Sequence, residues 1–213
     1  MVAKKEIFRL YKESRLLTKL YIRIKLKICP FLKMETFFPS NGKIIDLGCG
    51  NGFFSYILKL GSSSREIIGI DLDKKKIKVA EKIQKNATKI EFHIGNIIEM
   101  EYPNGDIFTL IDVLYLIPFA KQEIILKKCF SALNKGGLLI IKEMDTKPLG
   151  KYWWNFFQET LAVKIIGFTL GGRFYFRSRD EYLKILNDLG FKVDSFKLDS
   201  GYWYPHVLFL CQK

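Results

Sequence analysis

The first part of the chain carries apolar side chains at every third or fourth position. This stripe over residues 4–28 is typical of an amphipathic helix. Its members are Ile7, Leu10, Tyr11, Leu17, Leu20, Tyr21, Ile24 and Ile28. Residues 22–28 also alternate strictly, as a strand would, but the helix is favoured because the stripe is longer. Pro30 is expected to open a second short helix toward Phe38.

From residue 43 onward, short apolar runs alternate with helical stretches. The strands expected from this pattern are 43–47, 66–70, 90–94, 107–111 and 138–142, and the helices between them are 52–60, 73–85 and 121–133. The run 107–111 is wholly apolar, as buried parallel strands are. Repeated strand–helix units of this length predict a doubly wound, mostly parallel α/β sheet.

The last part of the chain departs from this alternation. Ser178 is expected to cap a helix over 178–189 that ends at Gly190. Two strands, 191–198 and 207–212, then form a hairpin appended to the sheet. The predicted fold class is therefore a Rossmann-like, doubly wound seven-stranded sheet, mostly parallel with an antiparallel C-terminal hairpin strand, plus N-terminal helices.

The composition is that of a single globular domain with an uneven charge. The chain has 213 residues, 48% of them hydrophobic, and a net charge of +13. Residues 1–42 hold ten Lys or Arg and three Glu, a net charge of +7. Such a segment attracts an anionic membrane surface, nucleic acid or an acidic carrier protein, although a merely solvated basic helix is an equal alternative.

Targeting and cysteine patterns point to the cytoplasm. No apolar run approaches the roughly 20 residues of a membrane-spanning helix, and no signal peptide is evident. The chain is therefore expected to be cytoplasmic, at most peripheral to a membrane. The four scattered cysteines indicate reduced thiols, with neither a disulfide framework nor a metal site; they are Cys29, Cys49, Cys129 and Cys211.

A glycine-rich loop follows the first predicted strand. Gly48, Gly50 and Gly52 let the backbone approach a ligand, and the helix that follows offers free N–H groups. The G-x-G-x-G spacing, with Phe53 next, differs from the G-x-G-x-x-G of dinucleotide folds. Asp71, which ends the second strand, could accept both ribose hydroxyls, but it would serve NAD equally well.

Five ordered segments carry a family resemblance. Residues 44–54, with Asp46 before the first glycine, resemble motif I of class I S-adenosylmethionine (SAM) dependent methyltransferases. The others are 69–73, similar to motif II, 93–97, the adenine-lining stretch, 112–116, motif IV, and 136–140, the turn and strand after the fourth helix.

The resemblance implies SAM as the cofactor and assigns a set of residues to it. These are Asp46, Gly48, Cys49, Gly50, Gly52, Asp71, Leu72, Asn96, Ile97 and Asp112. Asn96 stands where the family usually has an Asp, and its side-chain carbonyl could hold the adenine amino group. The resemblance also divides the single domain, 1–213, into a basic helical segment at 1–42, a SAM-binding core at 43–143, and a substrate lid with the hairpin at 144–213.

The residues that would act on the methyl acceptor are less sharply marked. Leu116 stands where many small-molecule methyltransferases carry a His, so orientation and desolvation would supply much of the catalysis. The candidates for catalysis or substrate contact are Tyr115, Asp145 and His206, each of which could equally be a local cap or a packed polar residue. His93 is expected to be structural. The sequence 112–115 lacks the N/D-P-P-Y/F pattern of base-modifying enzymes.

Aromatic side chains concentrate in residues 147–177, where this family inserts its substrate lid. The members are Tyr152, Trp153, Trp154, Phe156, Phe157, Phe168, Phe174, Tyr175 and Phe176. Arg173 and Arg177 could pair with a carboxylate or phosphate. We therefore expect methyl transfer to a lipid-like or apolar small molecule at a membrane surface, with nucleic acid a weaker expectation. The alternatives are a methyltransferase acting on RNA or protein, and a non-catalytic SAM-binding partner subunit.

Overall fold

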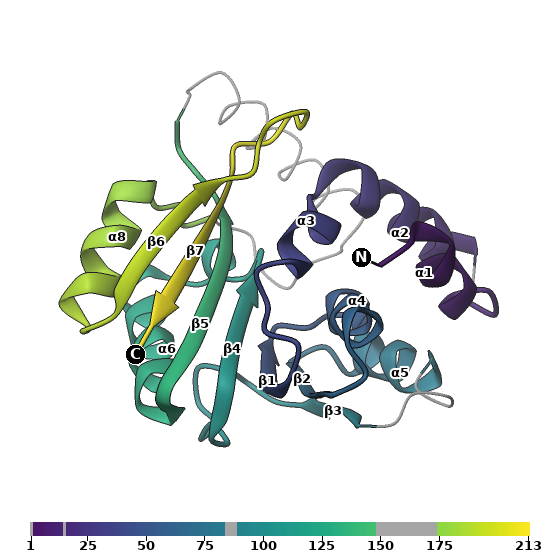
Figure 1. The fold of residues 1–213 in the computed structure, drawn as a ribbon, viewed down its shortest axis with the longest axis horizontal. Helices are drawn as coiled ribbons and strands as arrows, with labels where there is room; N and C mark the ends of the chain where they lie inside the picture. Colours follow the sequence, from purple (N-terminus) through teal and green to yellow (C-terminus); the bar gives the residue numbers. More distant parts are fainter. Residues whose placement is uncertain (1, 15, 84–88, 148–173) are drawn as a thin grey trace.

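A seven-stranded mixed sheet forms the centre of the molecule (Figure 1). The computed structural model describes residues 2–14, 16–83, 89–147 and 174–213. The strands are β1 (Gly42–Leu47), β2 (Arg65–Asp71), β3 (Ile90–Ile94), β4 (Gly105–Ile111), β5 (Leu133–Met144), β6 (Lys192–Lys197) and β7 (His206–Gln212). Their order is β3-β2-β1-β4-β5-β7-β6, and β7 runs antiparallel to both of its neighbours. The predicted fold class is confirmed.

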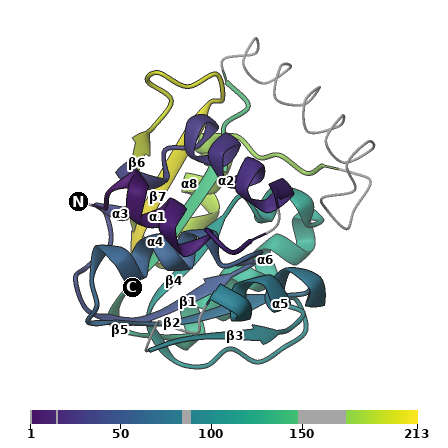
Figure 2. The same ribbon diagram turned by 90° about the vertical axis from the view of Figure 1, so that its right-hand side faces the viewer.

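Helices cover both faces of the sheet (Figure 2). Between the strands along the chain lie the helices α4 (Phe53–Gly61), α5 (Lys74–Ile83), α6 (Phe119–Ala132) and α8 (Arg179–Asp188), and the 3-10 turn η2 (Leu114–Leu116). Alternation along β1 separates two cores: Ile44 joins the core under α4 and α5, whereas Ile45 joins the core under α6 and α8. Among the described residues, no helix is long and apolar enough to cross a membrane.

The N-terminal segment forms three helices. They are α1 (Lys4–Leu10), α2 (Leu16–Ile28) and α3 (Phe31–Glu35). The prediction of one continuous helix over 4–28 was wrong, because the apolar stripe has a gap between Tyr11 and Leu17 that polar residues fill. The helical reading of 22–28 is confirmed over the strand reading, and α3 follows Pro30 as predicted.

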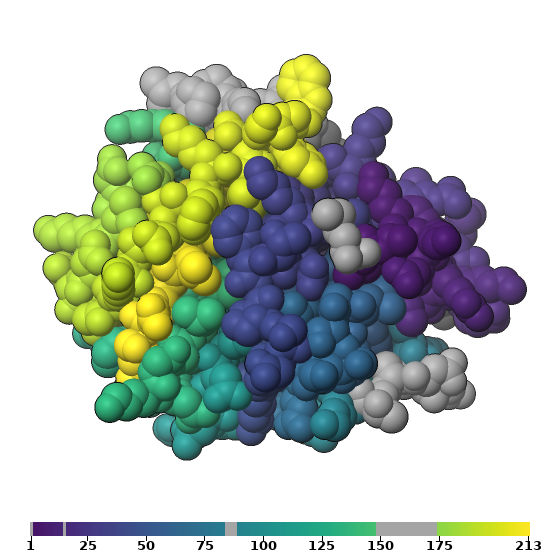
Figure 3. Space-filling model, viewed as in Figure 1, coloured from purple at the N-terminus to yellow at the C-terminus, as the bar shows by residue number. Residues whose placement is uncertain are grey.

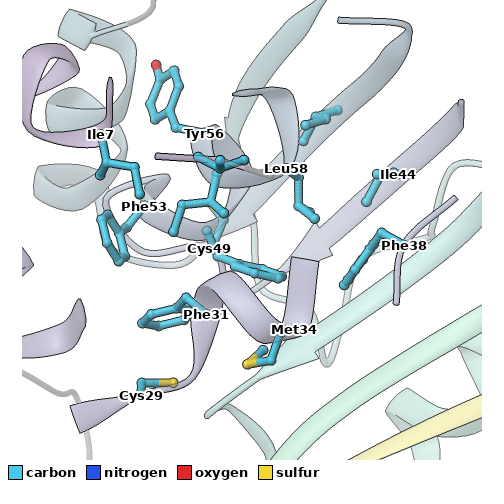
Figure 4. Close-up of a cluster of buried hydrophobic side chains, with 14 of the residues drawn as sticks. Ile7, Cys29, Phe31, Met34, Phe38, Ile44, Cys49, Phe53, Tyr56 and Leu58 are labelled. Atoms are coloured by element: carbon cyan, nitrogen blue, oxygen red, sulfur yellow. The ribbon is translucent and has the colours of Figure 1, made fainter. Parts of the chain in front are cut away.

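These helices share one core with the sheet (Figure 4). Ile7 of α1 and Met34 of α3 are fully buried, and Phe31 packs edge-on against Phe53 of α4 with ring centroids 5.2 Å apart. Tyr11 meets the same Phe53 ring at 6.0 Å. The N-terminal segment is therefore part of the folded domain, because its apolar side chains complete the face that α4 presents.

A buried arginine fixes α3 to the sheet. Arg65, the first residue of β2, pairs with Glu35 of α3 at 2.8 Å. Its guanidinium also donates to the carbonyl oxygens of Phe38, Pro39 and Leu58 at 2.6–2.9 Å. Both charged residues are buried, so removing either would leave its partner without compensation in a dry environment.

We predict that Arg65→Met lowers the free energy of unfolding by about 3–5 kcal/mol, because the Glu35 carboxylate would remain buried without its counter-charge. Lys89→Met is the matched control, since it breaks the exposed Lys89–Glu66 pair and should cost less than about 1 kcal/mol. Urea unfolding followed by circular dichroism measures both. Equal losses in the two variants would contradict the anchoring role of Arg65.

Candidate functional site

The chain reverses its direction across the sheet between β1 and β4. It runs outward from β1 to β3 and then returns to place β4 on the other side of β1. The loops after β1 and β4 therefore leave in opposite directions, and ligands of open α/β sheets bind in the crevice between such loops. The two loops touch, because a Cβ added at Gly48 would lie 2.5 Å from Cγ2 of Val113.

The three glycines of the loop share a backbone conformation but differ in what surrounds them. Their φ angles are +77° at Gly48, +57° at Gly50 and +70° at Gly52, all in the left-handed region. A Cβ at Gly52 would meet the Phe92 ring at 2.6 Å, so Gly52, like Gly48, is required by packing inside the protein. A Cβ at Gly50 would meet only the Lys76 side chain, at 4.0 Å. Gly50 is therefore the position that leaves its backbone open to a ligand.

Asp71 is held in place at the end of β2. Its Oδ2 accepts the Gly50 N–H and its Oδ1 accepts the Asp73 N–H, both at 2.8 Å. Each carboxylate oxygen keeps a second acceptor position. The side chain is only half-buried, so these positions fit the two hydroxyls of a ribose. The ribose assignment of Asp71 stays a prediction that this geometry favours.

The predicted adenine contacts lie at the neighbouring strand ends. Leu72 is 54% exposed, whereas Ile97 is buried. The Asn96 Oδ1 accepts the Ile98 N–H at 3.0 Å, which orients the amide and leaves one acceptor position for an amino group. The adenine assignment of these residues stays a prediction, and an exposed apolar side chain is available to cover the ring.

Asp46 and Cys49 are both buried, Asp46 at the end of β1 and Cys49 within the loop itself. The Asp46 carboxylate is buried and accepts the Ser55 hydroxyl of α4 at 2.5 Å. Burial raises the pKa of Asp46 to about 7. Burial likewise raises the pKa of Cys49 well above its ordinary value. Asp46 thus ties β1 to α4 and shapes the loop, while its predicted contact with cofactor stays a prediction.

Asp112, directly after β4, has a strained backbone and two charged partners. Its φ of +57° is left-handed, a conformation that costs energy in a residue other than glycine. Its carboxylate forms ion pairs with Lys142 of β5 and, at 3.8 Å, with Lys25 of α2. Burial raises the pKa of this carboxyl, but the two lysines outweigh it and hold the pKa below its usual range. Asp112 is therefore charged at neutral pH.

The sequence reading missed both lysines. Lys142 is fully buried, and the signal for it was a charged residue at the end of the apolar strand 138–142. Lys25 carried no signal, since it is one of many lysines in the N-terminal segment. Cys29, directly after α2, lies beside this cluster; burial raises the pKa of its thiol to about 12.

Glu143 holds the segment that follows Asp112. Its Oε1 accepts the N–H groups of Val113 and Leu114 at 3.1 and 2.8 Å. Burial, with the nearby Asp112 charge, raises the pKa of Glu143 to about 8. Its second oxygen has no hydrogen-bond partner among the described residues. Glu143 is therefore mainly protonated at neutral pH and acts as a neutral clamp on η2.

All three predicted catalytic candidates have structural partners, and two of them follow β4 and β5. Asp145 accepts the Arg179 N–H at 3.0 Å and so caps α8. Tyr115 is buried in η2 and stacks on Phe176, with ring centroids 5.0 Å apart and an interplanar angle of 4°. Both lie at the carboxyl ends of β4 and β5, where the substrate is expected, and their catalytic roles stay predictions.

His206, the first residue of β7, is buried against the end of α2. Its Nε2 lies 2.7 Å from the Ile28 carbonyl oxygen, and its Nδ1 has no hydrogen-bond partner in the described part of the chain. Burial and the Lys142 charge lower its pKa to about 3. The ring is therefore neutral and a weak base. His93 is exposed on β3, 3.4 Å from Glu91, and takes no part in the site.

The aromatic segment is only partly described. Residues 148–173, which include Tyr152, Trp153, Trp154, Phe156, Phe157, Phe168 and Arg173, lie outside the described residues. Arg177 is described and donates to Gln122 and Glu123 of α6 at 2.9 and 3.0 Å. Arg177 therefore has partners within the protein, and its pairing with a carboxylate or phosphate of a substrate stays a prediction.

A family model described as a methyltransferase domain matches residues 39–169, more than half of the chain. The chain belongs to this methyltransferase family. The predictions of a class I SAM-dependent methyltransferase, and of SAM as its cofactor, are thereby confirmed at the level of the family.

Relatives and solved structures resemble the methyltransferase domain. The carboxy-S-adenosyl-L-methionine synthase of Helicobacter pylori is 30% identical over 101 residues, which are 47% of this chain and only 42% of that relative. An O-methyltransferase family protein from Burkholderia thailandensis shares the fold over 96% of this chain and 61% of its own, with a TM-score of 0.73 and 15% identity. Magnesium protoporphyrin IX methyltransferase from Synechocystis, solved with bound SAH, covers 96% and 92% with a TM-score of 0.66 and 20% identity.

We predict that Asp71→Asn weakens SAM binding by about tenfold to a hundredfold, because it removes a charged acceptor for the ribose hydroxyls. Asp106→Asn is the matched control: Asp106 also accepts a backbone N–H at 2.8 Å, from Lys43, but at the amino end of the strands. Its SAM affinity should equal that of wild type. Calorimetric titration measures both, and an unchanged affinity in Asp71→Asn would remove the ribose assignment.

We also predict that Glu143→Gln gains stability over wild type as the pH rises. Between about pH 4.5 and pH 8 folded Glu143 holds a proton that the unfolded chain has released, so the stability of wild type falls with rising pH. The amide keeps an acceptor for both N–H groups and does not titrate. The stability difference should change by at most about 1.4 kcal/mol per pH unit. Urea unfolding near pH 5 and pH 8 tests this, with exposed Glu91→Gln as control; a pH-independent difference would contradict it.

Proposed function

We propose that the methyltransferase domain transfers the methyl group of SAM to an apolar, lipid-like small molecule at a membrane surface. The observation that carries this proposal is an aromatic wall beside Asp112. The wall consists of Tyr115, Phe174, Phe176, Tyr204 and Met144. It lies just beyond β4 and β5, at the same end of the sheet as the glycine loop.

The wall has the chemistry of an apolar binding surface. Tyr115 stacks on Phe176 with ring centroids 5.0 Å apart, and Phe174 lies 5.8 Å from both of these rings, so the three rings form one cluster. Both phenylalanines are half-buried, so each presents ring surface that a ligand could cover. Covering such surface is favourable because it removes apolar area from water.

Several residues would act on the cofactor and the reaction. SAM would supply a methyl group on its sulfonium: an acceptor lone pair would attack the methyl carbon in line while the carbon–sulfur bond breaks and S-adenosylhomocysteine leaves. Gly50 and Asp71 would bind the nucleoside, and Asp112, held charged by Lys142 and Lys25, would orient its amino-acid part. The aromatic wall would exclude water from the reacting centre.

The buried histidine restricts the kind of acceptor. With its pKa lowered to about 3, His206 is too weak a base to remove a proton from a neutral alcohol at neutral pH. The proposal therefore favours an acceptor atom that can attack without first losing a proton, such as an anionic oxygen or a neutral amine nitrogen, and rate enhancement by positioning.

A second candidate concerns the cofactor itself. The relative from Helicobacter pylori is a carboxy-SAM synthase, and two lysines lie beside the charge-bearing Asp112. A carboxylate added to the methyl group of the sulfonium would be attracted by the ammonium groups of these two lysines. In this alternative, a carboxylic acid would give up its carboxyl group as CO2 to the SAM methyl carbon and take up the proton that this methyl group loses, so that the chain would form carboxy-SAM instead of methylating an apolar acceptor.

We predict that purified chain and methyl-labelled SAM, incubated with a lipid extract, transfer label into the organic phase. Separate incubations with RNA and with total protein test the two other acceptor classes. Asp71→Asn should lose transfer in proportion to its lost SAM affinity, and Asp106→Asn should keep it. Label in RNA or protein, with none in the organic phase, would overturn the lipid-like acceptor.

Mass spectrometry of the recovered nucleoside tests the second candidate. That candidate requires a product in which a carboxyl group replaces one hydrogen of the SAM methyl group.

A further inference from the structure

Helix α2 presents two opposite faces with different partners. Its inner face buries Ile22 and Leu26 in the core. The same side of the molecule holds the Lys25–Asp112 ion pair and the contact between the Ile28 carbonyl and His206. The inner face therefore packs directly on the site.

The outer face of α2 is apolar and exposed. Leu16 is 80% exposed and Leu17 76%, and Leu20 and Ile24 follow with 51% and 48%. Spacings of one, four and eight residues place all four side chains on one side of a helix. Clustered exposed side chains of this size mark an interaction surface, whereas scattered ones need no explanation.

Basic residues line one edge of this apolar face. Lys19, Arg23 and Lys27 lie on α2 beside it, and α2 has no acidic residue. The Arg23 guanidinium lies 6.0 Å from the ring of Phe8 on α1, which is itself 39% exposed and extends the apolar area. The purple helices α1 and α2 form the right-hand rim of the molecule (Figure 3), where a flat surface could reach them.

We propose that the outer face of α2, with Phe8, docks on the surface of an anionic lipid bilayer. An apolar strip bordered by cations is the pattern of helices that lie in the membrane interface. The apolar side chains would enter the acyl boundary while the lysines and Arg23 pair with acidic headgroups. A protein partner would have to offer an apolar groove for the four aliphatic side chains together with acidic groups along the edge that carries the cations.

Docking in this way would bring the site to the membrane. Because the inner face of α2 touches Asp112, a bilayer on its outer face lies one helix away from the crevice. This inference deepens the proposed function, since a lipid-like acceptor would come from that bilayer. It can still hold or fail separately, because membrane binding requires no methyl transfer.

Sedimentation with vesicles tests the proposal on the full chain without cofactor. Wild type should bind vesicles of phosphatidylcholine with phosphatidylglycerol and bind pure phosphatidylcholine weakly. Leu17→Glu/Ile24→Glu, at exposed positions that should not disturb folding, should lower the partition coefficient roughly tenfold or more. Arg23→Glu/Lys27→Glu should lower it by at least about fivefold for each cation removed.

The matched control lies on α5, which is equally basic. Lys75→Glu/Lys78→Glu changes the net charge by the same amount at exposed positions on a helix whose inner face packs on the sheet. It should keep most of the vesicle binding. Equal losses from the α2 and α5 charge pairs would overturn the proposal in favour of nonspecific attraction by net charge.

Other occupants of the face give distinct results. Absence of vesicle binding by wild type overturns the proposal. The proposal is also overturned if wild type is a dimer on size-exclusion chromatography, Leu17→Glu/Ile24→Glu is a monomer, and neither form binds vesicles. If Asp71→Asn loses SAM binding but keeps vesicle binding, the docking face is supported. This result does not depend on whether the proposed methyl transfer occurs.

Discussion

The ion pairs of Asp112 are the constraint on which the arrangement of the site depends. They join the end of β4, the buried Lys142 of β5 and Lys25 of the N-terminal α2. A buried charge is tolerated only beside a partner of opposite sign, so the three elements must be placed together. The strained φ of Asp112 is maintained by this surrounding structure, and it sets the course of the loop after β4 that packs against Gly48.

The site is therefore built by two parts of the chain: one has the fold of the family, and the other carries side chains particular to this protein. The sheet and glycine loop follow the family pattern, and structures at 15–20% identity keep the same fold. The aromatic wall and the N-terminal helices add what the shared fold does not specify, namely an apolar surface and a basic, apolar face. Function of this kind resides in residues placed on a common fold and not in the fold itself.

Most of the fold could be predicted because strand and helix periodicity is local. β5 is longer than predicted, since Gly136 and Gly137 were read as a turn although the strand runs from Leu133 to Met144 with a register shift opposite β4. Side-chain partners were beyond reach where they are remote in sequence. The Arg179 N–H that Asp145 caps and the Ile28 carbonyl that His206 contacts lie 34 and 178 residues away, and no local pattern announces them.

Cys29 gives the packing of α2 a chemical consequence. Its thiol is buried where the helix meets the sheet, and burial raises its pKa to about 12. Alkylating reagents attack the thiolate, so the folded chain shields this sulfur both from contact and from ionisation. Covalent labelling at Cys29 can then proceed only when the last turn of α2 separates from the sheet. The labelling rate would thus count the opening events of the helix in solution, with or without a membrane.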